Sequence, residues 1–259
     1  MYDIIYLMSH YIYLSLFIIF CFVLERFFPR KKFASSSQEI FEGLNWFILN
    51  EVILAILLGK ISIYINTLIV QHHFSLNINL TQLPHWMSLI LYILILDFFS
   101  YWTHRFAHSI PKLWNIHKLH HSIQTFNSLY TFKHSLIWQL YIFVSLGLIG
   151  GLFQLNENIK MITPFIFLSF DIIQHANISF NRVPYFLNYI FILPRNHLIH
   201  HSQKNYLRYG QNFGLIFSFW DIIFKTYYLP QKLDVSLGLK NNDLPQSFFS
   251  RFFYPLTKR

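Results

Sequence analysis

Eight of the 14 histidines in this chain stand in three clusters, at spacings that bring side chains onto one face of an α-helix. Residues i, i+3 and i+4 of a helix share a face, so one HxxxH and two HxxHH clusters each present several imidazole nitrogens toward one point. Neutral imidazole is a ligand for zinc, copper, iron and nickel. The clusters therefore predict a metal site, and their members are His104 and His108, then His117, His120 and His121, then His197, His200 and His201.

The number of clustered histidines favours a centre with two metal ions. Four ligands close a structural zinc site, whereas eight nitrogens suggest two ions with positions left for water, dioxygen or a substrate. Cys21 is the only cysteine in the sequence, which excludes a thiolate zinc site and a disulfide framework. Isolated histidines such as His72, His73 and His85 are expected at a membrane interface or in loops.

Two aspartates are placed to orient histidines if their segments are helical. Asp97 precedes His104 by seven residues and Asp171 precedes His175 by four, so each carboxylate would share a helix face with a histidine. A carboxylate that accepts the free imidazole N–H orients the ring and raises its basicity as a ligand. The alternative role, a solvated cap or topology residue at a membrane interface, stays open for both. Glu51, inside an apolar segment, is a further candidate because intramembrane acids are often functional.

The composition is typical of membrane proteins. Of the 259 residues, 54% are hydrophobic, 20% are aromatic and only 12% are charged. The formal net charge is +9, but lysine and arginine are spread between apolar segments and form no basic helix with interleaved aromatics, which argues against a nucleic-acid partner. The positive charge is instead expected to set the orientation in the membrane.

Five apolar segments predict an all-α membrane bundle with about four or five spanning helices. They are residues 4–24, 44–58 with a continuation toward 70, 86–102, 137–153 and 161–173. Arg26, Arg30 and Lys31 follow the first segment, so the positive-inside rule places the N-terminus outside and the histidine clusters together in a cytoplasmic helical cap. No linker divides the chain, and residues 1–259 are expected to form one domain with its motif core at about 90–230.

The residues around the clusters resemble the membrane-bound fatty acid hydroxylase superfamily, which includes sterol desaturases, sterol methyl oxidases and alkylglycerol monooxygenase. The three boxes read DFFSYWTHRFAH at 97–108, LWNIHKLHHS at 113–122 and LPRNHLIHHS at 193–202. Asn127, the His-Ala-Asn at 175–177, the Asn-Phe-Gly at 212–214 and the Phe-Trp-Asp at 219–221 are similar to further family positions. Together these motifs are much more specific than a single HxxxH.

The resemblance implies a non-haem di-iron centre that uses dioxygen to hydroxylate or desaturate an unactivated C–H bond of a fatty acyl, sterol-like or ether lipid. It implies that the eight clustered histidines are iron ligands, adds His175 to them, and makes Asn127 a candidate next to the ligands. Electrons would come from a separate ferredoxin or cytochrome b5-like protein with its reductase, because the sequence has no GxGxxG after a predicted strand and no His-Pro-Gly-Gly haem segment.

Three positions depart from the family pattern. Lys133 and Ser135 stand where the family frequently has an arginine and a histidine after the second box, with His134 displaced by one position. Gly210 stands where an aspartate often precedes the C-terminal asparagine. The metal boxes are intact, so these departures bear on the substrate.

Three other functions compete with this interpretation. A zinc transporter or metal-binding protein would place its ligands near the bilayer midplane on broken helices, whereas these clusters follow the ends of predicted spans. A b-type cytochrome uses single histidines on separate helices and does not require HxxHH twice. A hydrolase with two zinc ions would need a general base, and the sequence has no HExxH and no acid beside the boxes.

Overall fold

The computed structural model describes residues 2–31, 35–76, 78–180, 183–203, 210–231 and 235–256. Helices dominate these residues, which confirms the expected helical class. The two described strands, β1 (Ile78–Asn79) and β2 (Phe153–Gln154), are two residues long each and pair in parallel. The architecture is therefore set by helix packing.

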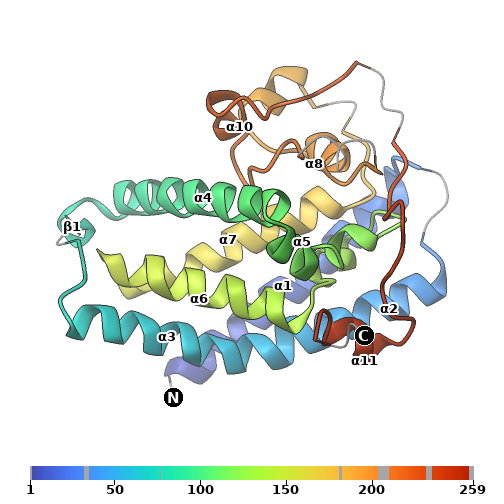
Figure 1. Ribbon diagram of the computed structural model, residues 1–259. Coiled ribbons are helices and arrows are strands. Elements are labelled where there is room, and N and C mark those ends of the chain that lie inside the picture. The colour runs from blue at the N-terminus through green and yellow to red at the C-terminus, as the bar shows by residue number, and fades with distance from the viewer. Residues whose placement is uncertain are drawn as a thin grey trace.

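Five long helices form the body of the molecule and lie roughly along one axis (Figure 1). They are α1 (Tyr2–Phe27), α3 (Ala55–Gln71), α4 (His85–Ser109), α6 (Leu136–Leu152) and α7 (Glu157–His175). A further helix, α2 (Ser37–Phe47), continues into α3 through the π-helical segment η1 (Ile48–Leu54). These helices coincide with the five apolar segments of the sequence.

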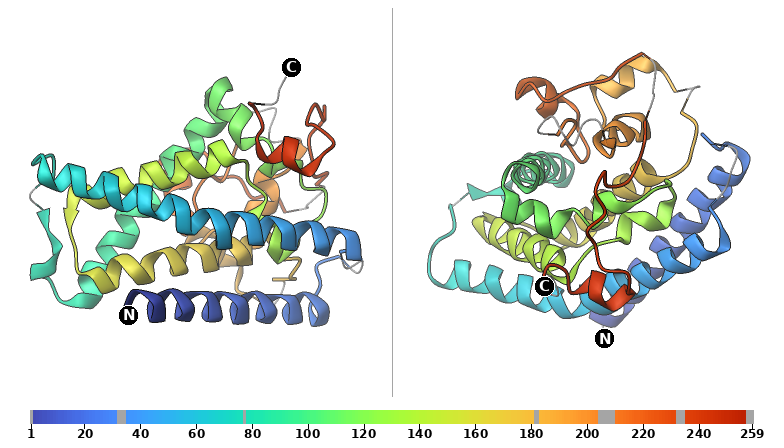
Figure 2. Two further views of the ribbon diagram at one scale, coloured as in Figure 1. Left: turned by 90° about the horizontal axis from the view of Figure 1, so that it is seen from below. Right: turned by 45° about the vertical axis from the view of Figure 1, so that its right-hand side comes forward.

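The short helices lie mainly at one end and along one side of this body (Figures 1 and 2). They are α5 (Pro111–His117), η3 (His120–Ser122), η4 (Ser128–Phe132), η5 (Tyr185–Tyr189), α8 (Pro194–His200), α10 (Phe219–Ile223) and α11 (Phe248–Phe252), whereas η2 (Leu80–Gln82) follows β1. The C-terminal segment, residues 235–256, returns to α2, where the rings of Trp46 and Phe248 lie 4.3 Å apart. We call this collection of short elements the cap.

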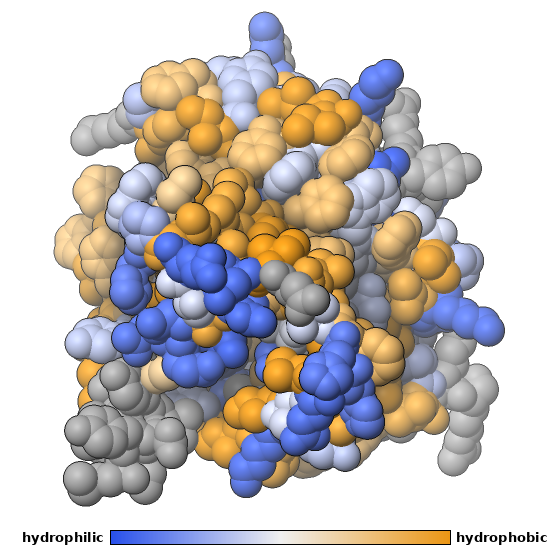
Figure 3. Space-filling model, turned by 90° about the vertical axis from the view of Figure 1, so that its left-hand side faces the viewer, coloured by the Kyte–Doolittle hydropathy of each residue, from blue (hydrophilic) through white to orange (hydrophobic). Residues whose placement is uncertain are grey.

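The long helices have the surface of a membrane protein. Residues 37–71 and 85–109 are long and apolar enough to cross a membrane, and Leu136–Leu152 is apolar but shorter. On α1, the apolar side chains of Tyr13, Leu16 and Ile19 are each more than half exposed. Figure 3 views the body from the end that carries β1 and shows hydrophilic residues near the middle of a largely apolar face. The number of spans and their orientation stay predictions.

Glycines set a close approach between α3 and α6. A Cβ added to Gly147 would lie 2.7 Å from the Ser62 carbonyl oxygen, and one added to Gly151 would lie 2.9 Å from the Cβ of Ile69. Small residues at a helix interface let two backbones come together. These glycines of α6 therefore serve helix packing.

We expect Gly147→Ala to lower the thermal stability of the detergent-solubilised protein, because the new methyl group overlaps the Ser62 backbone, an overlap that costs on the order of 1–3 kcal/mol. Gly59→Ala is the matched control on α3, since among the described residues no atom outside its chain neighbours and the adjacent helix backbone lies within 4 Å of its added Cβ. The unfolding midpoint of each variant is measured as the temperature at which the buried thiol of Cys21 begins to react with a labelling reagent. Equal midpoints for the two variants would contradict the packing argument.

Candidate metal centre

Helix ends bring the three boxes together. α4 ends at Ser109 directly after the first box, and Pro111 opens α5, so the chain turns before it reaches the second box. Pro194 opens α8, which carries most of the third box, and α7 ends at His175. The ends of four helices therefore deliver the histidines to one region of the cap.

The structure gathers all nine histidines that the sequence singled out into two groups. Within each group the nitrogens that could hold an ion lie within 4.8 Å of one another. The five-histidine group is His104, His108, His117, His121 and His200, and the four-histidine group is His120, His175, His197 and His201. Two ligand atoms on opposite sides of an ion are ~4.2 Å apart when each bond is ~2.1 Å long. With separations of up to 4.8 Å, each group is close in size to one ion's ligand shell and slightly wider than it.

Each HxxHH box contributes to both groups. In the second box, His117 and His121 belong to the five-histidine group and His120 belongs to the four-histidine group. In the third box, His200 belongs to the five-histidine group, whereas His197 and His201 belong to the four-histidine group. The rings of His121 and His201 stack across the boundary with centroids 4.3 Å apart. The groups are therefore interleaved and adjacent.

Short contacts between Nε2 atoms connect the four-histidine group. The Nε2 atom of His175 lies 3.0 Å from that of His120 and 3.0 Å from that of His197, which lies 3.1 Å from that of His201. Two ligands at a right angle around an ion are separated by ~3.0 Å when the bonds are ~2.1 Å, compared with ~3.4 Å in a tetrahedron. These contacts match neighbouring ligands of one ion.

The unpaired nitrogens also fit a metal. In the five-histidine group, the Nε2 atoms of His104, His108 and His200 are buried and have no hydrogen-bond partner among the described residues. A buried polar atom without a partner costs about 1–3 kcal/mol. A metal ion bound within the group would take up these lone pairs, so the donor set suits a metal centre made of neutral nitrogens.

Backbone carbonyls fix the orientation of three of the rings. The Nδ1–H of His104 donates to the carbonyl of Phe213 at 3.0 Å, and that of His200 donates to the carbonyl of Gln211 at 2.8 Å. In the other group, His175 Nδ1–H donates to the carbonyl of Asp171 at 2.8 Å. Because Nδ1 carries the proton in each ring, the Nε2 lone pair faces the group.

Asp221 holds the segment that supplies two of these carbonyls. Its carboxylate accepts the N–H groups of Phe213 at 2.8 Å and Gly214 at 2.9 Å, together with the hydroxyl of Thr226 at 2.7 Å. Burial raises the pKa of Asp221 to about 6. The carboxylate therefore positions His104 through the Phe213 peptide.

Asp97 holds the next part of the same segment. Its carboxylate accepts the N–H groups of Ile216 at 2.8 Å and Phe217 at 3.0 Å and the indole N–H of Trp220 at 3.0 Å. The sequence suggested a direct hydrogen bond to His104, but the proton of that ring goes to Phe213. Asp97 acts on the histidine through the loop.

Asp171 and Asn127 have different surroundings. A carboxylate oxygen of Asp171 lies 3.4 Å from Nδ1 of His175, and the carboxylate also accepts the hydroxyl of Thr131. Asn127 caps η4, because its side-chain oxygen accepts the N–H of Leu129 at 3.0 Å. Asn127 thus shapes the loop after the second box, whereas Asp171 lies beside a histidine of the four-histidine group.

Aromatic side chains enclose the two groups. The rings of His117 and Trp138 lie 4.1 Å apart, and His134, which is outside both groups, stacks on His120 at 4.6 Å.

Burial lowers the pKa values of six box histidines well below their usual range, and the charges of neighbouring imidazoles lower them further. These histidines are His117, His120, His121, His197, His200 and His201. The enclosure keeps the rings neutral, as metal ligation requires.

One partly buried and one fully buried polar residue that the sequence analysis missed support the loops around the site. Glu25 of α1 accepts the N–H of Ser128 at 2.8 Å and the N–H of Asn177 at 3.1 Å. Asn50, next to Glu51 in η1, donates to the carbonyls of Phe132 at 2.7 Å and His134 at 3.0 Å. The sequence did contain a signal for both residues, because each is a polar side chain inside or at the end of an apolar segment.

The three departures from the family pattern have structural explanations. Lys133 pairs with Glu42 at 3.2 Å, and Ser135 donates to the carbonyl of Ile116 at 3.0 Å, beside the second box. Gly210 has a φ of +73°, and a Cβ there would lie 2.6 Å from the Phe213 ring. This backbone favours glycine.

Comparisons with known proteins agree with the geometry. The sequence model of the fatty acid hydroxylase family matches residues 89–226, which is more than half of the chain and contains all nine histidines. No solved structure matches significantly.

Three curated relatives are similar over part of their length. Ornithine lipid hydroxylase OlsE of Rhizobium tropici is 26% identical over 186 residues, which cover 69% of this chain and 53% of that protein. Alkylglycerol monooxygenase of Xenopus tropicalis is 28% identical over 148 residues, covering 55% of this chain and 31% of the relative. Fatty acid hydroxylase vlmA of a Lecanicillium species is 27% identical over 157 residues, covering 54% and 42%. The chain spans about half or less of each relative.

We expect Asp221→Asn to loosen the five-histidine group, because an amide cannot accept three hydrogen bonds and its N–H₂ faces backbone donors. When both ions are bound, the ion in the five-histidine group makes up half of the metal. A chelator should remove this ion from the variant about tenfold faster than from the wild type. Asp171→Asn is the matched variant for the four-histidine group. Unchanged release from Asp221→Asn would contradict a positioning role for that carboxylate.

The metal-free protein should lose stability as the pH falls below about 6.5, the ordinary histidine pKa. The six box histidines have lower pKa values in the folded state, so the unfolded chain binds more protons. Their stabilisation is present above the unfolded pKa and is lost as the pH falls toward the folded values. Melting temperatures at about pH 7.5 and about pH 5.5 in chelator test this sign, and a midpoint independent of pH would contradict it.

Proposed function

The chain belongs to the fatty acid hydroxylase family, and we propose that it is a membrane-bound oxidoreductase that hydroxylates a lipid at a histidine-bound di-iron centre, with dioxygen as co-substrate. The observation that carries the proposal is the convergence of nine imidazoles in two adjacent groups, each close in size to one ion's ligand shell. Nitrogen ligands suit iron as well as zinc and copper. The family relationship supports iron as the metal in this proposal.

Two irons held here would supply the activation of dioxygen, of which one atom would enter an unactivated C–H bond and the other would leave as water with two electrons from the external donor and two protons. The five-histidine and four-histidine groups would hold one ion each, with His104, His175 and His200 pre-oriented by backbone carbonyls. Preorganised ligands avoid reorganisation when the ion binds. The role of Asp97 and Asp221 is to keep the carbonyl-bearing loop in place.

The surroundings of the histidines favour a retained metal over a transported one. Trp114 lies against His108 and His121, with centroids 5.0 and 5.2 Å away, and Phe126 lies 5.4 Å from His201. These side chains cover the groups and limit the access of water. An enclosed apolar wall also suits a reaction at a lipid chain, because water is kept from the reacting position.

The membrane arrangement follows from the same proposal. The apolar long helices would lie in the bilayer, and the cap would stand at its cytoplasmic surface with the N-terminus outside. Residues 1–259 would act as one unit, with a lipid that enters from the bilayer. A separate ferredoxin or cytochrome b5-like protein with its reductase would supply electrons.

Hydroxylation is proposed in preference to desaturation because the relatives are named as hydroxylases and monooxygenases. The test uses full-length protein, loaded anaerobically with ferrous iron in mild detergent and given a reductant, isotopically labelled dioxygen and a membrane lipid extract. We expect about two irons per chain, a coupled pair in the Mössbauer spectrum, and one labelled oxygen atom in a lipid product detected by mass spectrometry.

His121→Ala should lose iron and lower product formation by more than about 100-fold, because it removes a ligand from the five-histidine group. His72→Ala is the control, since that histidine is exposed and outside both groups. The proposal would be wrong if the protein held stoichiometric zinc that iron cannot replace, or if the iron-loaded protein transferred no labelled oxygen to any lipid.

A further inference from the structure

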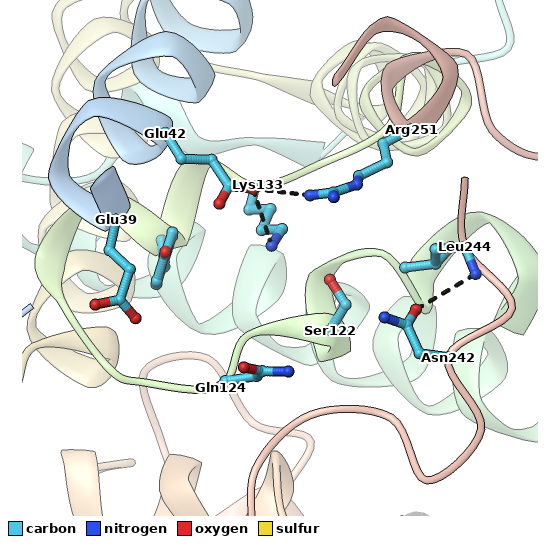
Figure 4. Close-up of a pocket in the computed structure, with 9 residues that line it drawn as sticks. Glu39, Glu42, Ser122, Gln124, Lys133, Asn242, Leu244 and Arg251 are labelled. Carbon is cyan, nitrogen blue, oxygen red and sulfur yellow. Dashed lines mark hydrogen bonds and ion pairs between the residues drawn. The ribbon is translucent and has the colours of Figure 1, made fainter. Parts of the chain in front are cut away.

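A polar cavity of about 220 Å³ adjoins the second histidine box. Its lining comes from α2, from the end of η3 and the loop after it, from η4 and the residue that follows it, and from the C-terminal segment (Figure 4). The lining residues are Glu39, Glu42, Ser122, Gln124, Tyr130, Lys133, Asn242, Leu244 and Arg251. Two acids, two bases and several neutral polar groups thus face one space in the cap.

The cavity shares backbone with the candidate metal centre. Ser122, in its wall, directly follows His121 at the end of η3. Lys133, also in the wall, precedes His134, whose ring stacks on that of His120. A molecule in the cavity therefore lies beside residues adjoining both histidine groups.

The charged residues of the lining give the cavity one positive end and one negative end. The Glu42 carboxylate is shared by Lys133 at 3.2 Å and Arg251 at 3.1 Å, so two positive charges meet one negative charge there (Figure 4). Among the described residues, the hydrogen-bond partners of Glu39 are neutral, namely Ser36 and the hydroxyl of Thr125. The cavity is dipolar, with an excess positive charge near Arg251 and an excess negative charge at Glu39.

The position along the membrane axis suits a lipid headgroup. The continuous helical stretch 37–71 has 35 residues. It is therefore ~52 Å long, against ~30 Å for the hydrocarbon core of a bilayer. With the apolar part of this stretch in the bilayer, as proposed above, its polar first turns, which carry Glu39 and Glu42, would extend beyond the core toward the headgroups.

We propose that this cavity binds the headgroup of a zwitterionic lipid substrate, with the ammonium group against Glu39 and the phosphate or carboxylate group against Lys133 and Arg251. The proposal rests on the proposed lipid hydroxylation, of which it names the substrate class. Gln124 and Asn242 add side-chain amides that can hydrogen-bond the rest of the headgroup. The anion can come from a phospholipid or from an aminoacyl lipid.

The test measures binding to the full-length, metal-loaded protein in detergent by native mass spectrometry. Four lipids with the same acyl chains are compared, namely phosphatidylethanolamine, an ornithine lipid, phosphatidylglycerol and diacylglycerol. We expect at least one of the two zwitterionic lipids to bind about tenfold more tightly than the other two, as one charge-assisted contact predicts. Tighter binding of phosphatidylethanolamine would identify the anion as phosphate, and tighter binding of the ornithine lipid would identify it as carboxylate.

Glu39→Gln should weaken binding of the zwitterionic lipids about tenfold and leave phosphatidylglycerol unchanged. Glutamine can still complete the capping box that Glu39 forms with Ser36 at the start of α2, so the helix is retained. Ser36→Ala is the matched control, because it weakens the cap and keeps the carboxylate. Arg251→Gln should weaken binding of all three charged lipids and spare diacylglycerol.

Equal affinity for the four lipids, or an equal loss for all of them in Glu39→Gln, would overturn the headgroup assignment. The hydroxylation assay is run on the same samples. Product formation without headgroup selectivity would reject this inference and leave the proposed function intact. Selective, Glu39-dependent binding without oxidation of any lipid would reject the proposed function and leave the headgroup site.

Discussion

The rest of the structure depends on nine imidazoles, seven of them buried and two partly buried, whose nitrogens converge at two points. A neutral imidazole has one N–H and one lone pair, so each ring needs a partner on both sides or it loses free energy relative to water. Carbonyls at Gln211, Phe213 and Asp171 satisfy one side of three rings. The remaining nitrogen of each of these three rings faces the other imidazoles of its group, where one metal cation can bind several lone pairs at once. The fold around the histidines is therefore organised to hold this cation-binding arrangement in place.

Long-range contacts complete that arrangement. The loop that carries Gln211 and Phe213 is fixed by Asp97 from α4, by Asp221 from α10, and by Gln174 of α7, whose amide donates to the Leu215 carbonyl. Buried carboxylates that accept several N–H groups keep a loop in one conformation without regular secondary structure. A loop that would otherwise be adaptable thus becomes a rigid support for the ligands.

Helical spacing predicted which histidines meet but could not predict how they divide. On one continuous helix, an HxxHH box would aim its three rings at one point. In both HxxHH boxes the structure places the histidines at i and i+4 in one group and the histidine at i+3 in the other. This division holds in the third box even though α8 is continuous from His197 to His200. Helix class and apolar segments followed from periodicity and composition. The roles of Asp97 and Asp221 did not, because their partners lie in other elements of the chain and no local pattern records them.

The interleaving of the two groups constrains how such a protein can evolve. Because each HxxHH box serves both groups, deletion of one box cannot leave an intact one-metal ancestor or descendant. A shift of one helix that carries such a box therefore moves histidines of both groups at once. Changes that leave this geometry intact are confined to the segments that surround the histidines, such as α2 and the C-terminal segment.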